Sequence, residues 1–321
     1  MLSFALVEQN GGFSVFEKTL PSLEELSGSK AVWIDFEKPS KGEIEFVQGI
    51  VKLHPLTVSD IFDNIKRPKA QVFSDYIFLI MHDVEFDGVR IVPTEVDFVV
   101  GKNFVLSFHS KSVNSIKKAM DFVVKDGHSF AKDSGRILHN IVNSIVDNYF
   151  PVLDKVSESV ESVEAEVFSN ATTKTLNKLF KLKKTLASFR RIEVPQREVV
   201  NFLYHHENGF IKKETTLYFR DIYDNLLIVS EFVDTSRELI SDAFDAYLSV
   251  ISNRLNEIMK VLTIISTIIL PLTLIVGFYG MNVSFLEYDF FGERGAYFFA
   301  IFLMLVVAVI MAAWFKKRDW F

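Results

Sequence analysis

The sequence predicts a mixed α+β and helical fold: an N-terminal α/β domain, long stalk helices, and two transmembrane helices at the C-terminal end. Short β-branched and aromatic runs occur in the first part of the chain, and long stretches with apolar residues at three- and four-residue steps follow them. Two charge-free stretches lie near the end. These observations divide the 321 residues into parts at 1–133, 134–258 and 259–321.

The first part contains strand-like runs and short helical pieces. The runs AVWIDF, YIFLIMHDVEF and EVDFVVGKNFVLSFH predict strands, and LTVSDIFDNI predicts a helix. Residues 101–103, GKN, interrupt two strand-like stretches and favour a hairpin. His54 stands directly before Pro55, where it favours a turn or a helix start.

Three long helices are predicted in the second part. The first covers residues 135–168 and ends at a break over residues 169–173, and the second runs from Leu176 to the region of Pro195. The third begins near Tyr218 and continues without glycine or proline to Leu262, directly into the first charge-free stretch. A helix over the whole of this segment would be on the order of 90 Å long.

Residues 261–286 and 295–315 carry no charged side chain. Each supplies the roughly 20 apolar residues that a helix needs to cross a bilayer, so we predict spans at about 261–281 and 295–315. The flanking cations Lys316, Lys317, Arg318, Arg254 and Lys260 outnumber the single Arg294 of the connecting loop. Both termini are therefore expected in the cytoplasm of a multi-pass inner-membrane protein.

The N-terminus has no basic stretch before a long apolar run, so no signal peptide is expected. The connecting loop would lie on the outer face of the membrane as a short acidic segment. Its carboxylates are Glu287, Asp289 and Glu293.

Cysteine is absent from the sequence, which excludes disulfide bonds and thiolate ligands, so any metal ion must be held by oxygen or imidazole. No GxxxxGK[ST], GxGxxG, HExxH or GxSxG pattern occurs. We expect neither an enzyme active site, nor an organic cofactor, nor a nucleic-acid partner. The adjacent His205 and His206 point in different directions on a helix, which favours a surface loop over a metal site.

A set of residues on the third helical segment follows steps of three and four, which keeps its members on one face of a slightly supercoiled helix. We call this set the polar stripe; it comprises Asp245, Ser249, Ser252, Asn256, Met259, Leu262, Ser266, Leu270, Thr273 and Gly277. Polar and small side chains on one face of a spanning helix avoid lipid, so they either pack against another helix or line water.

Helix packing and a water-lined pore are both open at this point. The pore is favoured because the polar stripe continues outside the membrane to Asp245, where avoidance of lipid imposes no constraint, and ends near Gly280 and Asn282 beside the acidic loop. Two spans cannot enclose a channel in one chain. Several subunits would have to surround an axis, and Asp245 and Asn256 would then form rings of oxygen atoms.

The motif YGMN, residues 279–282, stands at the end of the first span and carries a family resemblance. Four further stretches extend the similarity over nearly the whole chain: MKVLTIISTIILPLTLIVGFYGMN, the basic tail, HPLTVSDIFDNIKRPK and YFRDIYD. The chain resembles the CorA-type magnesium transporters. This resemblance implies a funnel-shaped homopentamer in a lipid bilayer that takes up Mg²⁺ passively, driven by the membrane potential, with Co²⁺ or Ni²⁺ as alternative ions.

The resemblance also implies roles for single residues. Gly280, Met281 and Asn282 would form the selectivity filter, and the polar stripe, including Met259 and Ser266, would line the pore. Thr273 and Asn256 would contact the hydrated ion, and Gly277 would give it room. Leu262 and Leu270 would form a hydrophobic constriction, and Asp245 would collect cations at the inner mouth.

Regulation follows from the same resemblance. Mg²⁺ bound between neighbouring subunits would hold the pore closed, with Asp60 and Asp221 as the matching carboxylates; the alternative is that both are solvated surface acids. Mg²⁺, transported and regulatory, is the expected cofactor.

One departure concerns the outer loop. It reads VSFLEYDFFGER, without the Met-Pro-Glu-like segment that is common in the family, so its residues receive no individual roles. Two other functions are weighed: a zinc transporter of the related branch, against which Met281 counts, and a non-conducting membrane-anchored metal sensor or scaffold.

Overall fold

The computed structural model describes residues 2–9, 12–16, 29, 31–63, 66–88, 90–130, 133–205, 209–281, 292–318 and 320. The chain divides into two compact units, Met1–Phe244 and Asp245–Phe321. The three-part division at residues 133 and 258 stays a prediction.

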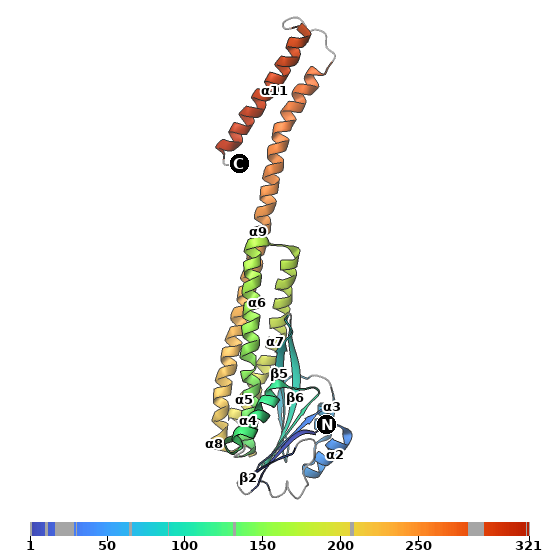
Figure 1. The fold of residues 1–321 in the computed structure, drawn as a ribbon, viewed down its shortest axis with the longest axis vertical. Helices are drawn as coiled ribbons and strands as arrows, with labels where there is room; N and C mark the ends of the chain where they lie inside the picture. Colours follow the sequence, from blue (N-terminus) through green and yellow to red (C-terminus); the bar gives the residue numbers. More distant parts are fainter. Residues whose placement is uncertain are drawn as a thin grey trace. The chain divides into compact units, whose positions relative to one another are not determined.

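A seven-stranded sheet organises the first unit, with strand order β2-β1-β3-β7-β6-β5-β4 (Figure 1). The strands are β1 (Leu2–Gln9), β2 (Gly12–Phe16), β3 (Ala31–Glu37), β4 (Lys69–Val72), β5 (Ile77–Phe86), β6 (Ile91–Val100) and β7 (Phe104–His109). Only β3 and β7 pair in parallel; the other pairs are antiparallel. The predicted strands and the hairpin at residues 101–103 are confirmed.

Helices cover both faces of this sheet. On one face, Ile44 and Val47 of α2 (Lys41–Ile50) join a core with Phe36, Phe78 and Leu106 of the strands, and α3 (Pro55–Phe62) packs against it. On the other side lie α5 (Ser134–Asp147), α6 (Tyr149–Asn170) and α7 (Thr173–His205), which contact β3 to β7, while α4 (Asn114–Phe130) packs beside α5. Strands β3, β5, β6 and β7 are therefore largely buried on both faces, as an α/β domain requires.

His54 begins α3 as predicted. Its Nδ1 accepts a hydrogen bond from the amide of Leu56 at 3.2 Å, and Pro55 occupies the first turn, where its missing N–H costs nothing.

A buried ion pair joins β3 and β7. His109 Nε2 lies 2.9 Å from Asp35 Oδ2, its Nδ1 lies 2.7 Å from the carbonyl of Lys111, and Ser107 donates to the same carboxylate. Burial alone would lower the pKa of His109, but the hydrogen bond and the charge of Asp35 outweigh it and raise that pKa. The one parallel strand pair thus carries a charge-assisted side-chain link.

The prediction of one long helix over residues 135–168 is wrong in one respect. The segment forms two helices, α5 and α6, which meet at Asn148. Pro151 explains the break, because it has no N–H for the carbonyl of Asp147 and its ring would collide with that carbonyl in a continuous helix. The Asn148 amide bonds Asp83 at 2.8 Å and the carbonyl of Val84 at 2.9 Å. The junction is therefore held against the sheet.

The predicted end of the second helix near Pro195 is also wrong, since α7 continues to His205 with Pro195 inside it. Buried Gln196, Val199 and Leu203 follow the proline and hold this part of α7 in the core. Tertiary packing therefore overrides the local signal. His205 is the last, exposed residue of α7 rather than part of a loop, and His206 lies outside the described residues.

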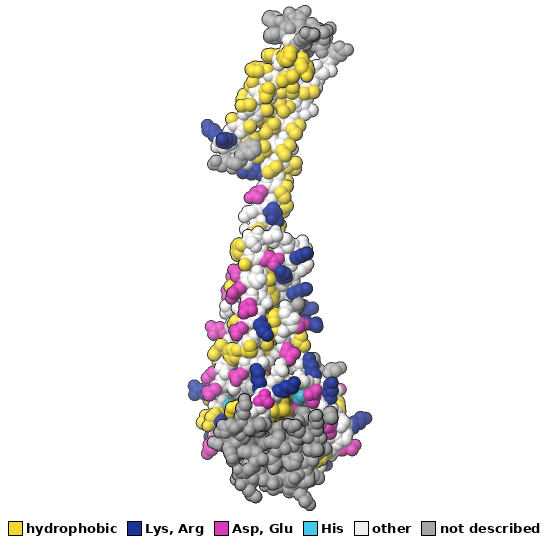
Figure 2. Space-filling model, viewed as in Figure 1, with side chains coloured by type: hydrophobic (Ala, Val, Ile, Leu, Met, Phe, Trp, Pro, Cys, Tyr) yellow, Lys and Arg dark blue, Asp and Glu magenta, His cyan; other side chains and the backbone are white. Residues whose placement is uncertain are grey.

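The third predicted helix is confirmed as α9 (Tyr218–Tyr279), which is preceded by the short α8 (Lys213–Thr216). Both α9 and α11 (Gly292–Lys317) contain segments long and apolar enough to cross a membrane. Figure 2 shows hydrophobic side chains covering the C-terminal helices, whereas charged side chains are frequent on the helices of the first unit.

The edge of the sheet at β5 is closed by side chains. The pairing of β4 with β5 ends at Lys69 and Ile80, so His82 lies beyond it. The buried Gln196 of α7 accepts from the His82 N–H at 2.8 Å and donates to the His82 carbonyl at 3.2 Å. The Tyr149 hydroxyl donates to the same carbonyl at 2.7 Å. The Gln196 side chain therefore makes the hydrogen bonds that a neighbouring strand would make to His82, and it links α7 to the sheet.

Two variants should separate these contacts. Gln196→Leu leaves the buried N–H of His82 unpaired, so we expect it to lower the free energy of unfolding by about 1–3 kcal/mol. Tyr149→Phe leaves that carbonyl bonded to Gln196 and should cost about 1 kcal/mol or less. Thermal unfolding of the detergent-solubilised protein measures both; a Gln196→Leu midpoint no lower than that of Tyr149→Phe would contradict the assignment.

Candidate functional site

The polar stripe lies on α9 in the second unit, and all ten of its residues are exposed there. With about 100° of rotation per residue, the five members from Leu262 to Gly277 fall within an arc of roughly 80°. Leu262 is 55% exposed and Leu270 is 71% exposed, so their own subunit leaves these apolar side chains largely uncovered. They must be covered by lipid or by another chain.

An open hollow of about 730 Å³ follows this face of α9. Its lining includes Ser266, Leu270, Thr273 and Gly277 of the polar stripe, together with Met281 of the YGMN motif. Ser266, Thr273 and Gly277 carry a small side chain or none, and they alternate in the lining with larger apolar residues such as Leu274 and Phe278. One helix cannot enclose a channel, so this hollow is at most one wall of a path for ions.

The Thr273 hydroxyl is oriented by its own helix. It donates its hydrogen to the carbonyl of Ile269 at 3.0 Å. The lone pairs of the oxygen then face away from the helix as acceptors, which suits the hydrogens of water around a cation. Thr267 makes the same bond to the carbonyl of Thr263, at 2.6 Å, about 120° around the helix from Thr273.

Two glycines of the predicted pathway differ in their surroundings. A Cβ added at Gly277 would meet no atom of its own subunit within 4 Å. Any steric need for glycine there must come from outside the subunit. Gly280 follows the end of α9 without a left-handed backbone, so its φ angle does not require glycine. A Cβ there would lie 3.1 Å from the carbonyl of Val276.

Most of the predicted outer-entrance and outer-loop residues lie in a part of the chain that the structure does not describe. Asn282, Glu287 and Asp289 lie outside the described residues, and Glu293 lies in the first turn of α11 without a described side chain. Their roles stay predictions.

Asp60 is a half-buried carboxylate at the end of α3 with two lysine partners. Lys69 Nζ lies 2.6 Å from its Oδ2, and Lys66 bonds its Oδ1. Burial would raise the pKa of Asp60, but the hydrogen bonds from Lys66 and Lys69 outweigh burial and lower that pKa. The carboxylate is therefore ionised at neutral pH and is compensated by cations of its own subunit.

Asp221 is exposed in the first turn of α9, where the helix N-terminus favours a negative charge. Figure 1 shows α3 and α8, after which α9 begins, on opposite sides of the sheet. The structure therefore does not bring Asp60 and Asp221 together within one subunit. A site that uses both would need two copies of the chain.

Sequence reasoning missed a buried polar group beside Asp60. His82, Glu95 and Asp97 project from β5 and β6, with 3.7 Å between His82 Nε2 and Glu95 Oε2. Burial raises the pKa of Asp97 well above its ordinary value, and the charges of Glu95 and Asp60 raise it further. The alternation in TEVDFVV could have placed Glu95 and Asp97 on one face. Among the described residues no group of three or more histidine and acidic side chains is arranged to hold a metal ion.

Comparisons with known proteins agree with this architecture. A family model described as "CorA-like Mg2+ transporter protein" matches residues 28–317. The cobalt/magnesium transport protein CorA of Thermotoga maritima is 34% identical over 271 residues, which cover 84% of this chain and 77% of that protein. The protein of the same name from Methanocaldococcus jannaschii is 26% identical over 307 residues, which cover 94% and 95%.

The complete structure of the M. jannaschii CorA magnesium transporter has the same fold. It superimposes with a TM-score of 0.86 at 21% identity and covers 100% of this chain and 99% of its own. The N-terminal α/β domain, the long helix and the two apolar C-terminal helices all find counterparts. Taken with the family match over most of its length, the chain belongs to the CorA family of divalent metal ion transporters, which are membrane proteins and not enzymes.

Proposed function

We propose that this protein conducts Mg²⁺ passively into the cytoplasm, driven by the membrane potential, as a homopentamer in the inner membrane with both termini on the cytoplasmic side. Co²⁺ or Ni²⁺ would be accepted in its place. The observation that carries this proposal is the line of small and polar side chains, Ser266, Thr273 and Gly277, on an exposed face of an otherwise apolar helix. The Thermotoga relative is named for cobalt and magnesium transport, which agrees with the choice of ions.

The hydration of Mg²⁺ explains why neutral oxygens suit this pathway. The ion gives up its water reluctantly, so groups that accept hydrogen bonds from bound water admit it more easily than groups that replace that water. Thr273 offers such an acceptor, because its hydrogen is directed to Ile269. The backbone at Gly280 and the amide of Asn282 would do the same at the outer entrance. Neutral acceptors also release the ion, whereas a carboxylate ring would hold it.

Closure is proposed to depend on Asp60 and on Asp221 of a neighbouring subunit. Two carboxylates across an interface repel each other, and a divalent cation between them turns that repulsion into attraction. In the described subunit Asp60 is neutralised by Lys66 and Lys69. A cation bound there would have to displace these lysines, which makes closure depend on the Mg²⁺ concentration.

The pathway can be tested by removing one hydroxyl from each subunit. Thr273→Val should lower Mg²⁺ flux into liposomes by a factor of about five or more, since one lost hydrogen bond to the hydrated ion is worth about 1 kcal/mol and every subunit loses one acceptor. Thr267→Val is the matched control, because that hydroxyl makes the same bond to its own helix on another face. Equal flux in the two variants would exclude Thr273 from the pathway.

Asn282→Ala should abolish flux while the size of the solubilised oligomer stays unchanged, because the outer acceptor ring is lost but the assembly is not. Parallel assays with Mg²⁺, Co²⁺ and Zn²⁺ report the ion. If Asn282→Ala leaves the measured flux unchanged and that flux equals the leak of protein-free liposomes, the protein is a non-conducting sensor or scaffold. Zn²⁺ flux without Mg²⁺ flux would assign the chain to the zinc branch.

If Asp60 and Asp221 together hold the ion that closes the pore, removing their charges should weaken regulation but leave conduction intact. Asp60→Asn combined with Asp221→Asn should weaken both the inhibition of flux by internal Mg²⁺ and the protection from protease that Mg²⁺ confers. Asp63→Asn with Asp224→Asn is the control, since Asp63 also contacts Lys66 at 3.3 Å and Asp224 is exposed one turn beyond Asp221. Inhibition that is unchanged in the first pair would refute the site.

A further inference from the structure

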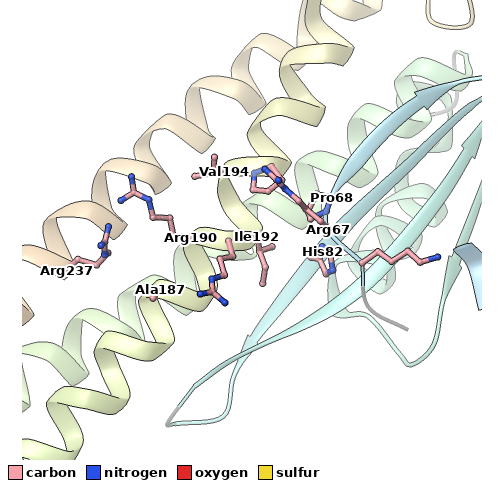
Figure 3. Close-up of a pocket in the computed structure, with 11 residues that line it drawn as sticks. Arg67, Pro68, His82, Ala187, Arg190, Ile192, Val194 and Arg237 are labelled. Carbon is pink, nitrogen blue, oxygen red and sulfur yellow. The ribbon is translucent and has the colours of Figure 1, made fainter. Parts of the chain in front are cut away.

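A second hollow, of about 710 Å³, lies in the first unit and has no role in the proposed ion pathway. Figure 3 shows its lining coming from three places that are distant in the sequence: the sheet edge, with Arg67 and His82; α7, with Arg190 and Ile192; and α9, with Arg237. Its volume is in the range of pockets that hold small organic ligands, about 300–1,000 Å³.

Positive charge is concentrated in this hollow, although the whole chain carries a net charge of −6. The cations that line it are Lys66, Arg67, Arg190, Arg191 and Arg237, and none of the described residues that line it is a carboxylate. Lys66 is paired with Asp60, while Arg190 and Arg237 share the single carboxylate of Asp234. Within the described part of the chain, Arg67 and Arg191 have no ion-pair partner. The mutual repulsion of these cations would be relieved by a bound anion.

His82 supplies a second, independent sign of a ligand. Its side chain is 1% exposed, and neither ring nitrogen has a hydrogen-bond partner among the described residues. Burial lowers the pKa of His82 to about 4, so the ring is neutral at pH 7 and offers one N–H donor and one acceptor. Glu95 Oε2 lies 3.7 Å from Nε2, too far for a hydrogen bond. A buried imidazole that makes no hydrogen bond at the wall of a hollow is costly unless a ligand bonds to it.

The rest of the wall is apolar and includes one backbone acceptor. Pro68, Ile192, Val194 and Pro195 give the hollow an apolar side. Because Pro195 lies inside α7, it has no N–H to donate to the carbonyl of Arg191 one turn earlier. A ligand that fits this wall therefore needs an uncharged, partly apolar portion with hydrogen-bonding groups, in addition to its negative charge.

We propose that this hollow binds a nucleoside polyphosphate, with the phosphates on the arginines and the nucleoside between His82 and the apolar wall. Guanidinium groups bind phosphate oxygens in pairs, which favours arginine over lysine at such a site. Inorganic phosphate would use the cations but leave the imidazole and the apolar wall unmatched, and a metal ion would be repelled. The metal-free nucleotide should bind more tightly than its Mg²⁺ complex, because the metal cancels two negative charges.

The test is ATP binding to the full-length protein in detergent, measured by calorimetry in EDTA and needing no transport assay. Arg67→Gln with Arg191→Gln should weaken binding roughly tenfold or more, since two charge-assisted contacts are lost. Both side chains are exposed and outside the core, so the variant is expected to fold. Lys183→Gln with Lys184→Gln, two exposed cations of α7 outside the hollow, is the charge-matched control.

Three comparisons decide the outcome. Weaker ATP binding in the arginine variant, with unchanged binding in the lysine control, would support the site, as would weaker binding in excess Mg²⁺. No ATP binding, or equal binding by both variants, would overturn it. Tripolyphosphate that binds as tightly as ATP would overturn the assignment of the nucleoside portion, which the apolar wall and His82 are proposed to recognise.

Discussion

The unbroken backbone of α9 is the constraint on which the rest of the protein depends. A helix satisfies almost all of its N–H and C=O groups internally, so the same element can begin at Tyr218 among the helices of the first unit and end at Tyr279 in an apolar segment. Pro271 lies inside this segment and has no N–H to donate to the carbonyl of Thr267, so the helix continues with one such bond missing. Its first part buries Phe219, Ile222 and Leu226 in the core of the first unit. Its last part presents the polar stripe. Any change in the packing of the first unit therefore acts on the element that carries the proposed pathway.

The three proposed sites present different chemical groups to ions. Along α9 the proposed ligands are neutral oxygens such as that of Thr273, whose hydrogen is directed inward to Ile269 and whose lone pairs are left for water. At Asp60 the proposed ligand is a carboxylate kept ionised by lysines, which a bound cation would have to displace. The arginines around His82 present the opposite charge. In our proposals the polar stripe of α9 conducts the ion, Asp60 responds to its concentration, and the arginines around His82 bind the polyphosphate that competes for the ion in the cytoplasm.

Most of the fold could be predicted from the sequence, because periodicity reports burial directly. Strands β3, β5, β6 and β7, the hairpin at residues 101–103, the start of α9 and the two apolar segments all follow from local pattern, whereas β1, β2 and β4 were not predicted. The errors lie at prolines. Pro151 ends a helix that periodicity alone would continue, whereas Pro195 is carried inside α7 because Gln196 and its buried neighbours are fixed on the sheet. A proline therefore does not by itself end a helix, since α7 continues through Pro195 and α9 continues through Pro271.

By itself, the sequence determined the two apolar helices, the α/β class of the first part, and the stripe of residues on one face of α9, since each depends on spacing along a single segment. It also determined, through YGMN and the segments in order around it, the family to which the chain belongs. The tertiary structure decided which groups from separate elements meet: Gln196 of α7 with the edge of β5, and the arginines of three separate segments around His82. It also placed Lys66 and Lys69, which follow α3, on Asp60 of that helix. No pattern within one segment contains these contacts, because they arise only when separate segments pack together.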